Sequence, residues 1–85
     1  MFVFVVRYVK QVDGEVESGT FDMCYTNEEA AHEAMIKDFE NTKAEWAKIA
    51  EISSSMGTDS CSILWTDLAN DWYELYIDKL EVVNG

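Results

Sequence analysis

The start of the chain has the short apolar and polar periodicity that is typical of β-strands. Residues 2–12 are rich in Val, Phe and Tyr and are apolar on both faces, which predicts a strand central in its sheet. Residues 15–25 carry their large apolar side chains mainly at alternate positions, which predicts a strand packed on one side. Asp13 and Gly14 form a strong turn signal between them, so we expect a β-hairpin.

The periodicity then changes to that of a helix, which we expect to span residues 27–52 because neither Pro nor Gly interrupts this segment. Thr26 and Glu29 fit a capping box at its start. The apolar stripe recurs at steps of three and four residues and comprises Ala31, Met35, Phe39, Thr42, Trp46 and Ile49. Residues 53–59 are mostly polar and are expected to leave the helix as a loop.

Two further strands are predicted, at residues 60–66 and 72–83, with a polar turn at 67–71. The order is therefore ββαββ, in a single α+β domain that comprises residues 1–85. The economical architecture is a four-stranded, mostly antiparallel sheet with one long helix packed on one face. The expected core comprises Phe4, Val6, Phe21, Met23, Met35, Phe39, Trp46, Ile49, Ile63, Leu75 and Ile77.

Charge narrows the class of partner. The chain has 17 acidic and 6 basic residues, a formal net charge of −11, yet 48% of its residues are hydrophobic, so we expect a folded domain. Such a domain repels nucleic acid and anionic membranes and favours a basic protein surface. In residues 53–85, Lys79 is the only basic residue against six acidic ones. The alternative is that the acids form a solvated surface that serves solubility.

The last predicted strand suggests where a partner would bind. Trp72, Glu74, Tyr76 and Asp78 share one face of this strand, which we expect to be the outer face of the sheet. Aromatic groups supply buried area in an interface, and interleaved acids select a basic partner. In the alternative register, Trp72 and Tyr76 lie in the core. With two acids of the preceding turn, the candidate partner-binding residues are Asp67, Asp71, Trp72, Glu74, Tyr76 and Asp78.

No residue pattern indicates catalysis, a metal or a cofactor. His32 is the single histidine and is expected to be a solvated helix side chain. Cys24 and Cys61 belong to no metal-binding pattern, and we expect two reduced, partly buried thiols, with a disulfide or a reactive thiol as the alternative. Residues 1–6 are apolar but lack the features of a signal peptide, and no apolar run is long enough to span a membrane. We therefore expect a cytoplasmic protein.

In size, acidity and α+β layout, the chain resembles the small inhibitors that bacteriophages and other mobile elements use against host defence, including anti-CRISPR proteins. Its most distinctive stretch is 65–74. The resemblance implies an inhibitor that occludes the basic nucleic-acid-binding surface of a nuclease or effector, without binding nucleic acid itself. A domain of this length spans about 30 Å, over which duplex DNA carries about 18 charges, so mimicry of nucleic acid requires acids gathered on one face. The alternative is a structural or adaptor subunit, for which the sequence favours a homodimer.

Overall fold

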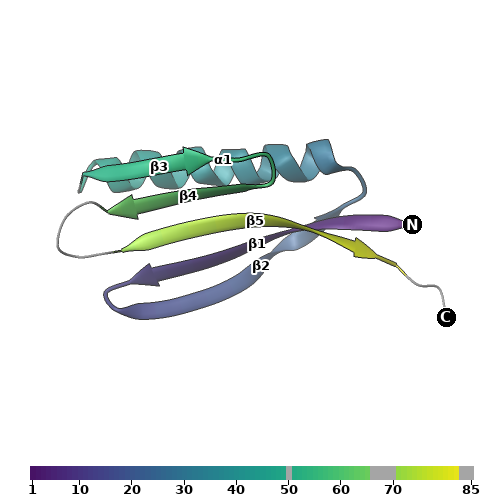
Figure 1. Cartoon of the computed structure of the whole chain (residues 1–85), viewed down its shortest axis with the longest axis horizontal. Coiled ribbons are helices and arrows are strands. Elements are labelled where there is room, and N and C mark those ends of the chain that lie inside the picture. Colours follow the sequence, from purple (N-terminus) through teal and green to yellow (C-terminus); the bar gives the residue numbers. More distant parts are fainter. Residues whose placement is uncertain (50, 66–70, 83–85) are drawn as a thin grey trace.

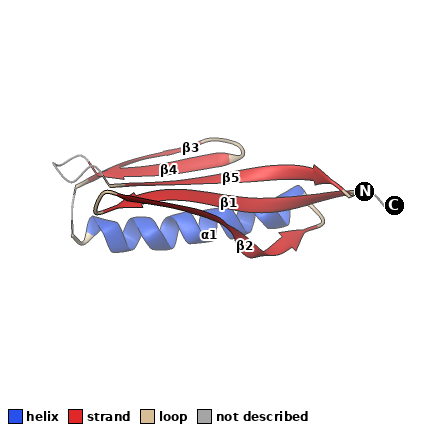
Figure 2. Cartoon of the chain, turned by 90° about the horizontal axis from the view of Figure 1, so that it is seen from below, coloured by secondary structure: helices blue, strands red, loops and turns tan. Residues whose placement is uncertain are grey.

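The computed structural model describes residues 1–49, 51–65 and 71–82 and shows one helix against a five-stranded antiparallel sheet (Figure 1). The strands lie in the order β2-β1-β5-β4-β3, and α1 lies on one side of them (Figure 2). The elements are β1 (Phe2–Val12), β2 (Glu15–Tyr25), α1 (Glu28–Ala47), β3 (Ile52–Met56), β4 (Ser60–Trp65) and β5 (Trp72–Glu81). The α+β class and the single covering helix are confirmed, but the predicted four strands and ββαββ order are wrong by one strand.

The first hairpin forms where its sequence predicts. Asp13 and Gly14 have φ angles of 53° and 83°, the left-handed pair that a two-residue type I′ turn requires. The pairing of β1 with β2 is irregular between Val5 and Arg7. This irregularity interrupts the alternation of β2, and Met23, predicted to be in the core, is 65% exposed.

The helix is shorter than predicted at both ends. Asn27, rather than Thr26, caps it, because the Asn27 Oδ1 accepts a hydrogen bond of 2.8 Å from the Ala30 backbone N–H. The helix ends at Ala47, and Ile49, predicted to lie in its apolar stripe, is 70% exposed. The segment predicted as helix end and polar loop contains β3 (Ile52–Met56), whose backbone pairs with β4. Serine is tolerated in a strand that has one side in solvent, and pairing with β4 decides the conformation.

The core lies between α1 and one side of the sheet. Val6, Met35, Ile63 and Leu75 are fully buried there, as predicted, and Phe39 is nearly so. Other predicted core residues pack partly buried against this cluster, namely Phe4, Phe21, Trp46 and Ile77. The core also contains Ala31, Cys61 and Tyr73, which the predicted set omitted.

A hydrogen bond joins the helix to the sheet at this core. The Tyr73 hydroxyl donates a hydrogen bond of 2.6 Å to Asp38 Oδ1, and the rings of Tyr8 and Trp46 lie beside Tyr73, each with a centroid separation of 6.3 Å. Burial and the bond to Asp38 raise the pKa of Tyr73. The contact fixes α1 against β5, so the opposite side of β5 is held in a defined position.

Candidate protein-interaction face

The side of the sheet away from α1 is the candidate site, and we call it the open face. Strand pairing places alternate residues of each strand on it. No element within the described residues covers it (Figure 2). Its central positions are Val3, Val5, Arg7, Val9 and Gln11 of β1, Trp72, Glu74, Tyr76, Asp78 and Leu80 of β5, and Ser60, Ser62 and Leu64 of β4.

Four of the six predicted binding residues meet on this face. Pairing with β1 places Trp72, Glu74, Tyr76 and Asp78 opposite Gln11, Val9, Arg7 and Val5. The outer register of β5 is therefore confirmed, and the alternative that buries Trp72 and Tyr76 in the core is wrong. Their role in binding stays a prediction.

The two turn acids of the predicted set differ from these four. Asp71 is only 2% exposed, and its Oδ1 accepts a hydrogen bond of 3.1 Å from the Asp13 backbone N–H. It therefore joins the start of β5 to the β1–β2 turn and offers little carboxylate surface to a partner, contrary to its predicted role. Asp67 lies outside the described residues.

Arg7 organises the centre of the open face. Its Nε donates a hydrogen bond of 2.9 Å to Asp78 Oδ2, and its guanidinium lies 4.6 Å from the centre of the Tyr76 ring. The Tyr76 hydroxyl donates in turn to Glu74. Sequence analysis missed this network because Arg7 lies on a strand 71 positions away from Asp78.

These contacts change the electrostatics expected of the face. The bond to Asp78 and its charge raise the pKa of Arg7, which stays a cation, and the bond to Glu74 raises the pKa of Tyr76. Arg7 offsets Asp78, whereas Glu74 keeps its negative charge although it accepts a bond from a neutral hydroxyl. The centre of the open face therefore carries one uncompensated acid, which is less than the concentrated anionic surface that the sequence suggested.

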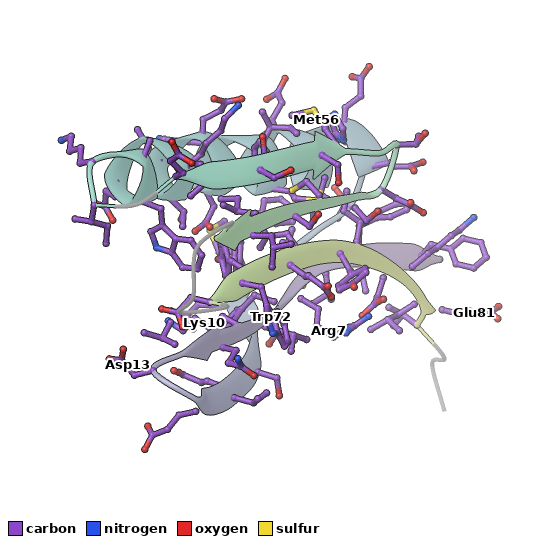
Figure 3. The ribbon with its side chains drawn as sticks, turned by 60° about the vertical axis from the view of Figure 1, so that its left-hand side comes forward. Arg7, Lys10, Asp13, Met56, Trp72 and Glu81 are labelled. Atoms are coloured by element: carbon purple, nitrogen blue, oxygen red, sulfur yellow. The ribbon has the colours of Figure 1, made fainter. Side chains whose placement is uncertain are left out.

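Aliphatic groups lie on both sides of this centre, and acids lie around it. Leu64 and Leu80 are 47% and 50% exposed. Exposed acidic residues occupy strand ends and turns, namely Asp13, Glu51 and Asp59. Glu15 and Glu81 are also exposed at strand ends, but their pairing with Val12 and Phe2 places them on the α1 side of the sheet. Figure 3 shows Arg7 and Trp72 between Asp13 at one end of the sheet and Glu81 at the other. The open face thus combines aromatic and aliphatic side chains with a central ion pair and with acids at its ends, and aromatic and apolar groups within a charged rim are common in protein interfaces.

A second acidic region lies at the start of α1. A depression of about 460 Å³ is lined by Glu28, Glu29, His32, Glu33 and Thr58, the last from the β3–β4 turn. No group of three His, Cys, Asp or Glu side chains among the described residues has a geometry that could hold a metal ion. Within the same described ranges, no helix is both long and apolar enough to cross a membrane.

The two cysteines are both free thiols, so they form no disulfide. Cys61 is buried, as expected, and its pKa is raised to about 11, mainly by burial and further by the nearby charges of Asp38 and Glu40. Cys24 is exposed, contrary to expectation, opposite Val5 on the open face. In comparisons with known proteins, no family model, no curated protein and no solved structure matches the chain.

Proposed function

We propose that this protein is a non-catalytic binding protein that docks its open face on a basic surface of another protein. The observation that carries the proposal is the placement of Trp72 and Tyr76 on the middle strand of an uncovered sheet face with acids at its ends. Both side chains are partly exposed, and aromatic groups that a partner buries supply most of the binding energy in many interfaces. The acids of the rim then steer association toward a cationic partner and orient it.

The dimensions of the open face support this proposal. With the usual strand rise and spacing, three long strands and two short ones make a planar area of about 650 Å². Side chains raise the accessible area above the planar value, which brings it near the roughly 800 Å² that each partner buries in a standard interface. The face therefore has the size for one stable contact with a protein.

The partner class that we propose is a protein with a basic nucleic-acid-binding surface, which the docked domain would occlude. The molecule is 49 Å long, and over that length a DNA duplex carries about 29 phosphates. The protein has a net charge of −11, so it carries far fewer charges over the same length than the duplex does. The extended shape therefore favours occlusion through a docked face with a charged rim over imitation of the duplex itself.

A second candidate function is that of a small adaptor subunit that binds its own copies. The observation that favours it is the set of aliphatic side chains on the open face, Val3, Val5, Val9, Leu64 and Leu80. Such a patch usually marks an interface. The net charge opposes self-association most strongly at low salt. Light scattering at low and high salt tests this candidate, because a monomer in both conditions contradicts it.

The experiment for the main proposal starts with affinity capture from the host lysate, followed by purification of the captured basic protein. Its dissociation constant is then measured for the wild type, Trp72→Ala and the control Phe2→Ala across a salt series. Phe2 is a suitable control because it is an aromatic residue that is 45% exposed but pairs with Glu81, off the open face.

Trp72→Ala is expected to weaken binding by about 2 kcal/mol, roughly 30-fold, whereas Phe2→Ala stays close to the wild type. Binding is also expected to weaken as salt rises. Circular dichroism confirms that each variant is folded. Equal losses from both variants, or affinity that does not depend on salt, would contradict docking through the open face.

A further inference from the structure

The two edge strands of the sheet are protected to different degrees against pairing with another chain. β2 (Glu15–Tyr25) forms one edge; it carries Glu15, Glu17 and Asp22, and its pairing with β1 is irregular. Charged residues and bulges are the devices by which proteins prevent an edge strand from pairing with another chain. β3 (Ile52–Met56) forms the other edge and reads Ile-Ser-Ser-Ser-Met, with no charged residue and no proline. This edge lacks those devices.

The hairpin between β3 and β4 shows which backbone groups of β3 point outward. The Gly57 N–H donates to the Ser60 carbonyl at 2.7 Å, so these two residues form a hydrogen-bonded pair. In an antiparallel ladder such pairs alternate with non-bonded ones. With the observed register, the N–H and C=O groups of Ile52, Ser54 and Met56 therefore face away from β4. Ser54 and Met56 are exposed, and Figure 1 shows β3 as the outermost strand.

Acidic side chains lie near one end of this edge. The β3–β4 turn contributes Thr58 to the depression that Glu28, Glu29 and Glu33 line, and no Lys or Arg among the described residues lines it. The depression therefore lies at the Met56 end of β3, on the side of the sheet that α1 covers. A strand added beside β3 would direct alternate side chains toward α1. Cationic side chains at these positions would meet the three glutamates.

From this combination we infer that β3 binds an extended, lysine- or arginine-bearing segment of a protein by strand addition. Main-chain hydrogen bonds supply the affinity in this mode, and alternate side chains supply the specificity. The inference rests on the proposed function for the sign of the partner's charge, and it adds a second contact surface at right angles to the open face. A second copy of the chain fits less well, because each copy brings a net charge of −11 and the same acidic depression.

The sheet offers a matched pair of substitutions for the test. Ser54→Pro removes an outward N–H from β3 and places a ring on that edge, while proline remains compatible with an edge strand. Ser18→Pro makes the same change on β2. The turn at Asp13 and Gly14 makes Val12 and Glu15 a hydrogen-bonded pair, and bonded and non-bonded pairs alternate along the ladder. Ser18 and Val9 form the third pair after it, which is a non-bonded pair, so the Ser18 N–H faces away from β1.

The probe is a short synthetic peptide of alternating lysine and threonine, with two control peptides. One control carries N-methyl groups on the residues that would pair, and the other has glutamate in place of lysine. Binding is measured by titration with nitrogen-15-labelled protein, which reports the backbone amides of β3 and the indole of Trp72 separately. Amide hydrogen exchange of Ser54 and Met56 reports new hydrogen bonds directly.

The lysine peptide is expected to slow amide exchange at Ser54 and Met56 and to shift these signals without shifting the Trp72 indole. Ser54→Pro should weaken its binding by about tenfold or more, since at least one main-chain bond and its neighbours are lost. Ser18→Pro should bind like the wild type, and neither control peptide should bind. The double variant Glu29→Gln, Glu33→Gln should bind more weakly, most clearly at low salt.

Any of three results would overturn the inference. The lysine peptide could fail to protect the amides of β3 from exchange, Ser54→Pro could bind this peptide as tightly as the wild type does, or the glutamate peptide could bind as tightly as the lysine peptide. Protection of Ser54 that depends on protein concentration without peptide would assign the edge to a second copy instead. A shift of the Trp72 indole alone would also overturn it but would leave docking through the open face intact, so the two proposals fail separately.

Discussion

Replacement of Asp71 tests whether its carboxylate serves the fold or the binding of a partner. The side chain is 2% exposed and accepts a bond from the Asp13 backbone, 58 positions away. Asp71→Ala removes the acceptor, and a hydrogen bond to a charged group contributes about 1.5–3 kcal/mol. Because Asp13 is exposed, water can replace part of the lost bond. We therefore expect the free energy of unfolding to decrease by about 1.5–2 kcal/mol, near the lower end of that range.

For a domain of this size, such a loss lowers the melting temperature by about 6–16 °C. Asp71→Asn keeps an acceptor oxygen and should lose about half as much stability as Asp71→Ala. Asp22→Ala, which removes an exposed acid of β2, is the matched control and should stay within about 0.5 kcal/mol of the wild type. Urea denaturation gives the free energies of unfolding, and an unchanged slope shows that the unfolded states are comparable.

The reasoning is refuted if Asp71→Ala unfolds at the same urea concentration as Asp22→Ala. It is also refuted if Asp71→Ala keeps wild-type stability but loses affinity for the captured partner. The second result would restore the role that the sequence suggested for this residue, as an anion presented to a basic surface.

Two predictions concern the buried titratable groups. The pKa of Tyr73 is raised in the folded protein, so this group's contribution to stability is complete below pH 10, the ordinary pKa of a tyrosine, and decreases as the pH rises further. Tyr73→Phe should reduce this alkaline loss of stability in urea titrations and should lower the stability at neutral pH. An unchanged dependence of stability on alkaline pH would contradict the role of Tyr73. Cys24 should react with a thiol reagent at pH 8 much faster than Cys61, because Cys61 is buried and its pKa is raised to about 11; equal rates in the Cys24→Ser and Cys61→Ser variants would contradict this.

The strands that the sequence predicted correctly are those with strong local signals. The Asp13–Gly14 turn located the hairpin of β1 and β2, and the alternation of side chains in the strand predicted at 72–83 identified β5 (Trp72–Glu81) and its outer face. β3 was missed because its three serines have little intrinsic preference. Its conformation depends on pairing with β4, which is a tertiary contact that a local pattern does not contain.

The candidate site was predictable in its aromatic residues but not in its electrostatics. Alternation along β5 was enough to place Trp72 and Tyr76 on one face. Counting charges along the chain could not show that β1 lies beside β5 and brings Arg7 to Asp78. In the same way, the burial of Asp71 depends on where the β1–β2 turn lies in space. Charges that are close in sequence therefore gave a poor estimate of the charge on a surface.

The most direct test of the open face as the docking surface is site-specific photo-crosslinking to the captured basic protein. A benzoylphenylalanine replaces Leu64, which is 47% exposed on the open face, or Glu40, which is exposed on α1. Neither position belongs to the predicted binding residues, so the probes report location without removing them. We expect a crosslinked product from position 64 and none from position 40. A product from position 40 alone would contradict docking through the open face.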